Sequence, residues 1–407
     1  MTVSPTATLQ GDYISTPPFV PVSVLAAMRA SWSTGMGAAS VLHERGCVVN
    51  GRGQYRGSPQ LPDGSKCSTC NATVQECPPC VPPVLSAPVD ESATIAQAAA
   101  AASLAEVAVV VLGLCGNNEG MRDPDGMCTI SCPTPTSPSR TCALPTETEA
   151  HDRADLLLPG AQLELLKAVH ATGTPTVLVL INAGPIDISW AKENVDAIIW
   201  AGYGGQSGGT AVVDALLGVS NPGGALPYTV LPQRFAELAD FGDMGMRPNA
   251  SSGNPGRTYR FLDTTKVAPL WQFGFGLSYT TFAIAFVESV HRATPLAPTE
   301  ASEWAVRVEN TGAAVGDVVV ICFVAAVKQD VVEVPPIRSA FAFERVEGLH
   351  PGARTTLNFT LSARGRALAN EAGQWVTPAG SYSVQCEAGG VAKTAAASVT
   401  VAATHGE

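Results

Sequence analysis

The stretch Val107-Ala108-Val109-Val110-Val111-Leu112-Gly113 decides the fold class of this chain. An apolar run without alternating polar side chains is typical of a strand that is buried on both faces of a parallel sheet. Two similar runs follow, Thr176-Val177-Leu178-Val179-Leu180-Ile181-Asn182 and Ala197-Ile198-Ile199-Trp200-Ala201. Each of the three runs ends in a glycine-containing loop, so we predict successive parallel strands.

Helical segments separate these strands. We expect helices at 91–104, 161–171 and 210–217, and an earlier one at 22–32. Strands that alternate with helices predict an α/β fold, here a three-layer α/β/α sandwich with a mostly parallel sheet. Ligands of such sheets bind at the carboxyl ends of the strands, so we expect functional residues in the loops that follow them.

The most hydrophobic window, 98–115, contains Ser103 and Glu106 and is rich in alanine. This composition favours a helix that enters a buried strand over a membrane span. We therefore predict no membrane association.

The loop Gly202-Tyr203-Gly204-Gly205-Gln206-Ser207-Gly208-Gly209 is similar to a dinucleotide-binding fingerprint. However, it follows the third strand, its G-x-G-x-x-G spacing is broken, and no acidic residue lies at the expected distance downstream. We interpret its glycines as sites of close helix-to-sheet packing and predict no cofactor.

From Thr280 to Val401 the sequence alternates with period two and contains turn signals such as Asn310-Thr311-Gly312 and His350-Pro351-Gly352. This pattern predicts an all-β sandwich. Cys322 and Cys386 fall in its strands and could form a disulfide or pack as buried thiols; we favour thiols, because cysteine is often a core residue. Residues 231–278, rich in aromatic and basic side chains, are predicted to form a wrapping segment.

Composition restricts the class of protein. A chain of 407 residues with 46% apolar and 14% charged residues is folded and has room for about two or three domains. With 24 basic and 35 acidic residues, the net charge is -11, and no Lys/Arg cluster is present. Nucleic acid is therefore excluded as an expected partner.

Eleven cysteines, most of them before residue 143, indicate disulfides and an extracellular or secretory location. Cys67-x-x-Cys70 and Cys77-x-x-Cys80 could also bind structural zinc, but only six residues separate the pairs, so we favour disulfides over zinc and over free thiols. We predict no metal site. The sequons at Asn71, Asn249 and Asn358 agree with a glycoprotein, whereas Met1 to Asp12 does not have the features of a signal peptide.

The acidic stretch Glu147-Thr148-Glu149-Ala150-His151-Asp152-Arg153 precedes Leu158-Pro159-Gly160-Ala161-Gln162, where a helix begins. Neighbouring carboxylates raise one another's pKa, and a guanidinium keeps a partner carboxylate ionised, so this cluster could supply a proton donor. The alternative is a solvated loop at a helix entry, because structural ion pairs also gather charges.

The order of motifs resembles glycoside hydrolase family 3, above all its β-xylosidase and β-glucosidase branches. The resemblance rests on Thr8-Leu9-Gln10-Gly11-Asp12-Tyr13, Val110-Val111-Leu112-Gly113, Glu147-x-Glu149-x-x-Asp152-Arg153, Leu158-Pro159-Gly160-x-Gln162, the glycine loop 202–209, Gly223-Gly224-Ala225-Leu226-Pro227, Gly256-Arg257-Thr258-Tyr259-Arg260-Phe261 and Phe273-Gly274-Phe275-Gly276-Leu277-Ser278-Tyr279-Thr280. The C-terminal sandwich is similar to the fibronectin type III-like domain that ends many of these enzymes. The resemblance implies an α/β sandwich domain at 1–278, with Cys-rich insertions near 47–83 and 115–145, and a fibronectin type III-like domain at 279–403.

The resemblance also implies retaining hydrolysis of a β-linked oligosaccharide or aryl glycoside. In the family, an aspartate nucleophile lies on a TIM barrel that this chain does not contain, and a glutamate of the second domain is the acid/base. Carried over to this sequence, Glu149 is the first choice for that glutamate and Glu147 the second. Asp152 and Arg153 would hold and tune the loop, and His151 is a loop residue.

Two hypotheses follow. The chain could be the C-terminal part of a retaining β-glycosidase, inactive by itself, that supplies the acid/base loop to a barrel. Alternatively, it could be a non-catalytic fragment of the same fold that binds carbohydrate or protein.

Overall fold

A computed structural model describes residues 22–33, 41–42, 55–56, 84–85, 92–114, 141–142, 153, 155–240, 242–287, 295–327, 329, 331–394 and 396–403. The contacts between residues divide the chain into two compact units, Met1–Leu217 and Gly218–Glu407. The first unit contains the predicted parallel sheet, and the second contains the predicted sandwich.

The sheet of the first unit consists of β3 (Ala108–Gly113), β5 (Thr176–Ile181) and β6 (Ala197–Trp200) in the order β3-β5-β6. All its pairs are parallel; Val111 is paired with Val179, for example, and Leu180 with Trp200. Four consecutive residues at the end of both β3 and β5 are buried. The continuous apolar runs of β3 and β5 therefore predicted buried strands correctly, whereas β6 has a similar run but none of its four residues is buried, so that part of the prediction is wrong.

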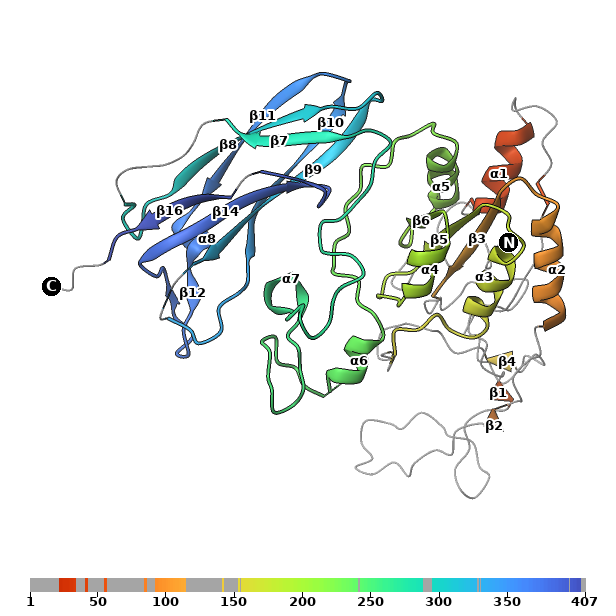
Figure 1. Ribbon diagram of the computed structural model, residues 1–407, viewed down its shortest axis with the longest axis horizontal. Coiled ribbons are helices and arrows are strands. Elements are labelled where there is room, and N and C mark those ends of the chain that lie inside the picture. Colours follow the sequence, from red (N-terminus) through yellow and green to blue (C-terminus); the bar gives the residue numbers. More distant parts are fainter. Residues whose placement is uncertain are drawn as a thin grey trace, which may run out of the picture. The chain divides into compact units, whose positions relative to one another are not determined.

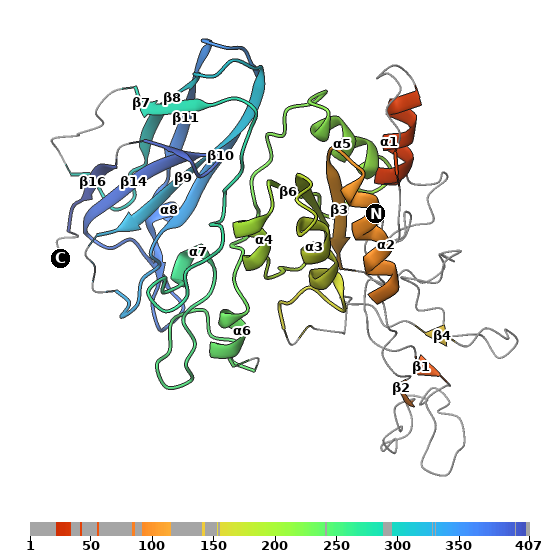
Figure 2. The ribbon, with the colours of Figure 1, turned by 45° about the vertical axis from the view of Figure 1, so that its right-hand side comes forward.

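Helices cover this sheet (Figures 1 and 2). They are α1 (Val24–Ser33), α2 (Ser92–Ser103), α3 (Gln162–His170), α4 (Ser189–Asn194) and α5 (Gly208–Leu216). One apolar cluster joins α1 and α5 to the face of the sheet that carries Val111 and Val179. On the other face, α2 packs beside α3, and Leu165 and Leu166 of α3 are buried. The three-layer α/β/α arrangement is confirmed.

Gly209 allows the close contact between α1 and α5. A Cβ at this position would lie 2.3 Å from the carbonyl oxygen of Val22. The amide of Gly209 donates a hydrogen bond to that oxygen at 3.1 Å, and the amide of Val22 donates to the carbonyl of Gln206 at 2.8 Å. The glycine at this position thus serves packing of α5 against the start of α1, whereas we had predicted helix-to-sheet packing for the glycines of this loop.

A small antiparallel sheet joins both Cys-rich regions of the first unit. It consists of β1 (Tyr55–Arg56), β2 (Val84–Leu85) and β4 (Thr141–Cys142) in the order β2-β1-β4. Both C-x-x-C pairs, the sequon at Asn71, the motif at 8–13 and most of the two insertions lie outside the described residues. The choice between disulfides, zinc and thiols there stays a prediction.

The second unit is dominated by two antiparallel sheets that pack as a sandwich (Figure 1). One has the order β11-β8-β7, and the other has the order β10-β9-β14-β15 with β16 also paired to β14. The strands are β7 (Phe282–Phe286), β8 (Ser302–Asn310), β9 (Gly316–Ala326), β10 (Ser339–Leu349), β11 (Arg354–Leu361), β14 (Gly380–Ala388), β15 (Ala392–Lys393) and β16 (Ala397–Val401). A short helix α8 (Ala363–Arg366) and the hairpin of β12 (Leu368–Ala369) and β13 (Trp375–Val376) complete the unit.

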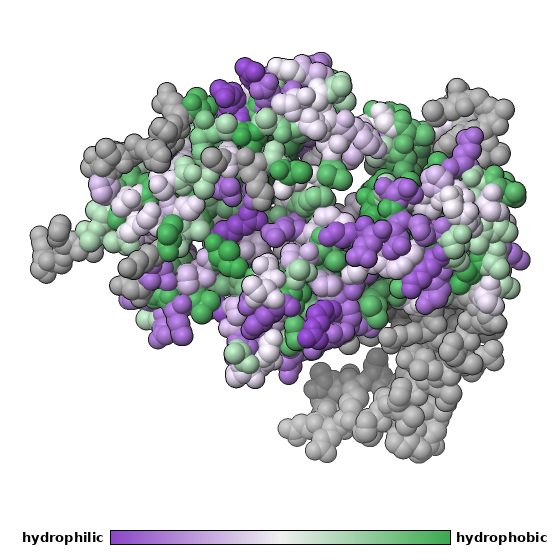
Figure 3. All heavy atoms as spheres, viewed as in Figure 1, coloured by the Kyte–Doolittle hydropathy of each residue, from purple (hydrophilic) through white to green (hydrophobic). Residues whose placement is uncertain are grey.

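The sandwich core follows from period-two alternation. Along β8, every second residue from Ser302 to Asn310 is buried. Trp304, Val306 and Val308 join Val320 and Val384 of the facing sheet in one apolar cluster. Hydrophilic and hydrophobic residues are interspersed on the face of each unit that Figure 3 presents.

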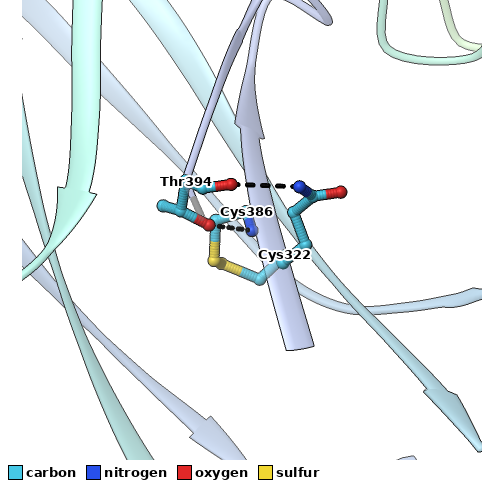
Figure 4. The surroundings of a disulfide bond; sticks show 4 residues. Cys322, Cys386 and Thr394 are labelled. Carbon is cyan, nitrogen blue, oxygen red and sulfur yellow. Dashed lines mark hydrogen bonds between the residues drawn. A yellow bond between two sulfur atoms is a disulfide. The ribbon is translucent and has the colours of Figure 1, made fainter. Parts of the chain in front are cut away.

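Cys322 and Cys386 form a disulfide, so our preference for buried thiols is wrong. The two cysteines are directly opposite each other on the antiparallel neighbours β9 and β14, with their Cα atoms 4.0 Å apart. They bridge adjacent strands of one sheet, and both are fully buried. The hydroxyl of Thr394 accepts a hydrogen bond from the amide of Cys386 at 3.0 Å (Figure 4).

Residues 218–281, which include the predicted wrapping segment 231–278, belong to the second unit. This segment contains α6 (Arg234–Leu238) and α7 (Thr258–Phe261). Tyr259 and Phe273 stack with centroids 4.5 Å apart, and both rings meet Phe323 of β9 edge-on. Because its contacts join it to the β-sandwich, the structure groups this segment with the second unit.

None of the helices among the described residues is long and apolar enough to cross a membrane.

Candidate active site at the carboxyl edge of the parallel sheet

The carboxyl edge of the parallel sheet is where sequence reasoning placed the site. Of the predicted residues, Glu147, Glu149 and Asp152, together with His151, lie outside the described residues. Arg153, the last residue of the acidic stretch, is described. The site can therefore be built from the strand ends and from this anchor.

Arg153 binds the loop that follows β5. Its Nη1 donates to the carbonyl of Pro185 at 3.0 Å, and its Nη2 donates to the carbonyl of Leu157 at 2.5 Å. Its side chain is 15% exposed and lies 3.7 Å from the Asp155 carboxylate. Pro185 follows the end of β5 by four residues. The end of the acidic stretch is thus attached to the carboxyl edge of the sheet.

Gln162 joins the next helix to the end of β3. Its Oε1 accepts from the amide of Gly113 at 2.8 Å, and its Nε2 donates to the Gly113 carbonyl at 2.9 Å. Gln162 is fully buried, so these bonds satisfy polar groups that have no access to water. Gly113 has φ 151°, and a Cβ there would lie 1.9 Å from the Ile181 carbonyl oxygen. Only glycine fits at this strand end.

Our sequence analysis gave Gln162 no role, although the sequence contains a signal for one. Gln162 shares a helical face with Leu165, Leu166 and Val169, at spacings of three, four and seven residues. A glutamine on an otherwise apolar face predicts a buried hydrogen-bonded amide.

The loop after β5 is held from two sides. Asn182 is 1% exposed; its Nδ2 donates to the Gly184 carbonyl at 2.7 Å, and its own carbonyl accepts from Trp200 Nε1 at 3.1 Å. Asp187 Oδ1 accepts from the amide of Ser189 at 2.8 Å and from its hydroxyl. The amide of Asp187 donates to the Leu156 carbonyl. The loop therefore lies between the end of β6 and the chain that leads into α3.

These contacts collect the ends of β3, β5 and β6 and the exit of the acidic stretch at one edge. Side-chain hydrogen bonds to backbone groups hold these strand ends and loops in place, so this edge is able to position a loop. Among the described residues, no group of three His, Cys, Asp or Glu side chains could hold a metal ion.

The sequence model of the "Glycosyl hydrolase family 3 C-terminal domain" matches residues 3–279. The chain belongs to glycoside hydrolase family 3. The "Fibronectin type III-like domain" matches residues 318–389 within the sandwich. The family resemblance and the fold class that we inferred from the sequence are both confirmed.

Curated relatives in this family are named as xylosidases. "Probable exo-1,4-beta-xylosidase bxlB" of Aspergillus flavus is 34% identical over 257 residues, which cover 60% of this chain and 32% of that protein. "Beta-D-xylosidase 1" of Arabidopsis thaliana is 49% identical over 146 residues, or 35% of this chain and 18% of that protein. The aligned part of the chain spans about a third of the Aspergillus protein and less of the Arabidopsis one.

Solved structures of the family share the fold. An exo-beta-xylosidase in complex with a xylobiose aziridine activity-based probe aligns with a TM-score of 0.66 and 25% identity, over 98% of this chain and 44% of the solved one. A β-glucosidase from Erythrobacter marinus aligns with a TM-score of 0.65 and 24% identity, over 98% and 46% of the two chains.

Proposed function

We propose that this chain is the C-terminal part of a retaining β-glycosidase of the β-xylosidase or β-glucosidase type. It would supply the acid/base loop to a TIM barrel of the same family that carries the nucleophile. One observation carries the proposal: Arg153 attaches the end of the acidic stretch to the carbonyl of Pro185, at the edge where α/β sheets bind ligands.

Glu149 is the proposed acid/base and Glu147 the alternative. In the first step the nucleophile attacks the anomeric carbon, the glycosidic C–O bond breaks, and Glu149 gives its proton to the departing oxygen. In the second step the Glu149 carboxylate takes a proton from water, whose oxygen attacks the anomeric carbon and releases the nucleophile. Asp152 would keep the loop in place together with Arg153.

The substrate would be a β-linked oligosaccharide or an aryl glycoside. The printed names of the Aspergillus and Arabidopsis relatives favour a β-xyloside. Each alignment covers a third or less of those proteins, so assays on aryl β-xylosides and β-glucosides decide between xylose and glucose.

The proposal includes an extracellular or secretory location. The disulfide between Cys322 and Cys386 supports it, because such bonds persist in oxidising compartments. The sequon residues Asn249 and Asn358 are both exposed, which permits glycosylation. The proposal also includes a role in xylan breakdown, which the printed names of the xylosidase relatives support. We also retain the proposed domain division, 1–278 and 279–403.

Assays of the 407-residue chain alone and of the chain joined to a family barrel test the proposal. We expect no turnover of aryl β-xylosides or β-glucosides by the chain alone, and turnover when the barrel is joined. Turnover by the isolated chain that Glu149→Gln abolishes would show that the nucleophile lies within these residues. Sugar binding without turnover in the joined protein would favour the non-catalytic alternative.

The leaving group separates the two glutamates. Loss of the acid should slow an aryl glycoside with a poor leaving group far more than one with a good leaving group, because the latter departs without protonation. We expect this pattern for Glu149→Gln and not for Glu147→Gln. Equal losses on both substrates for both variants would contradict the assignment.

A further inference from the structure

The hairpin of β12 and β13 holds a tryptophan whose ring is half exposed. Trp375 is 54% exposed and lies opposite Ala369 in the hairpin. It belongs to a run of exposed residues, 371–376. Tryptophan is usually buried for most of its surface, and a half-exposed indole leaves a flat apolar surface open to solvent.

One face of this indole is covered by a guanidinium. The Cζ atom of Arg364, from α8, lies 3.4 Å from the centroid of the Trp375 ring. The hydroxyl of Thr377 donates to the Ala363 carbonyl at 3.2 Å, which ties the hairpin to α8 beside this stack. A stacked guanidinium orders the ring through cation–π attraction, so little freedom remains to be lost when a ligand binds the other face.

The hairpin also holds hydrogen-bonding groups next to the ring. The backbone amide of Gln374 donates to the side-chain oxygen Oδ1 of Asn370 at 2.9 Å. The side-chain oxygen Oε1 of Gln374 accepts from Asn370 Nδ2 at 3.2 Å. These two hydrogen bonds fix the side-chain amide of Gln374, the residue directly before Trp375. Glu371, at the same tip, is exposed.

A flat apolar surface beside a fixed amide group and an exposed carboxylate suits a ligand with one apolar face and polar edges. A pyranose ring has that form, because its axial C–H bonds make an apolar face and its equatorial hydroxyls form the rim. A few placed polar groups beside an apolar surface are what orients such a ligand.

We propose that the Trp375–Arg364 stack, with Gln374 beside it, is a carbohydrate-binding platform on the fibronectin type III-like domain. A pyranose of a β-linked polysaccharide would stack on the free face of the indole, and the choice of a xylan rests on the proposed function. This site binds the polymer and takes no part in bond cleavage.

Affinity electrophoresis of the 407-residue chain in gels that contain soluble xylan tests the platform. Xylan should slow the chain, and Trp375→Ala should weaken the binding about tenfold, as truncation of a central aromatic anchor does. Trp375→Tyr should keep most of the binding, and Arg364→Ala should lose part of it. A proline-rich peptide should not bind.

Phe343→Ala is the matched control. Phe343 is 76% exposed on β10 of the same domain, so its removal tests the general effect of losing an exposed aromatic ring. It should leave the retardation unchanged. Equal retardation of Trp375→Ala and the wild type, absence of retardation in the wild type, or capture of the proline-rich peptide instead of xylan would each overturn the platform.

Failure here is distinguishable from failure of the proposed function. Binding is measured on the chain without catalysis, and the Glu149→Gln variant should bind xylan as the wild type does. Hydrolysis of soluble aryl glycosides should be unaffected in Trp375→Ala of the barrel-joined protein. Loss of that hydrolysis would instead place Trp375 in the catalytic machinery and contradict a separate platform.

Discussion

The parallel sheet and the β-sandwich are held together by different kinds of bond. In the parallel sheet, Gln162 holds the end of β3 and Arg153 holds the loop after β5, both through backbone groups at one edge. In the sandwich, the Cys322–Cys386 bond joins directly paired residues of β9 and β14 inside the apolar core. Bonds at strand ends position loops, whereas a bond in the middle of a sheet serves stability. The first pattern is therefore the one that the proposed acid/base loop requires.

Removing the disulfide should have the largest effect on stability. It closes a loop with a sequence separation of 64 residues, and loss of such a crosslink costs about 2–4 kcal/mol. We expect Cys322→Ala/Cys386→Ala to lower the free energy of unfolding of the sandwich by that amount, measured by urea denaturation. The parallel sheet should keep its own transition. Simultaneous loss of both transitions would contradict the separate roles.

Gln162→Leu should come next and should act at the functional edge. The substitution leaves the buried amide and carbonyl of Gly113 without partners, at about 1–3 kcal/mol for each group. The unfolding temperature of the first unit should fall accordingly. When the variant is joined to a barrel, it should also lose activity. Leu163→Gln, a half-buried neighbour on α3, is the control. An equal loss in both variants would remove the special role of Gln162.

Tyr382 gives a pH test that concerns the sandwich alone. Burial raises the pKa of Tyr382 to about 12, above its usual value of 10. The folded state therefore holds this proton more tightly, so its contribution is complete below pH 10 and is lost as the pH rises toward 12. We expect the free energy of unfolding to fall by about 2 kcal/mol over this range.

Tyr382→Phe is the matched control for that titration. It removes the hydroxyl that donates to the Pro378 carbonyl, at a cost of about 1 kcal/mol at neutral pH. Its stability should not show the decline between pH 10 and 12. An unchanged decline in the variant would assign the titration to another group.

Arg153→Met should have a small effect on stability and a large one on activity. The side chain is only partly buried and its bonds are made to two carbonyls, so we expect about 1 kcal/mol. In the barrel-joined protein, the value of kcat should fall with little change in unfolding. Arg234→Met, which breaks an exposed ion pair with Glu237, should change neither quantity.

The difference between the two sheets also explains what the sequence could predict. β3 and β5 were predictable because their apolar runs are continuous. β8 was predictable because its sequence alternates with period two, which matches its alternating burial. Helix α4, with six residues, is too short to show helical periodicity. The disulfide depends on the register that places Cys386 opposite Cys322, which no local pattern fixes.

The candidate site was likewise predictable only where a sequence pattern indicates it. The carboxyl edge could be identified from the order of strands and loops, and Arg153 lies there. Gln162 was missed because a polar residue at a helix start is usually interpreted as exposed, and only its spacing from Leu165 and Leu166 shows otherwise. The roles of Glu149 and Glu147 stay predictions.

Azide trapping of the barrel-joined Glu149→Gln protein tests the central claim most directly. Azide can attack the glycosyl-enzyme without a general base and releases the nucleophile as a carboxylate. The account predicts that azide restores turnover and yields a β-glycosyl azide, identified by NMR, while Glu147→Gln gives none. An α-glycosyl azide, or a β-glycosyl azide from Glu147→Gln alone, would contradict it.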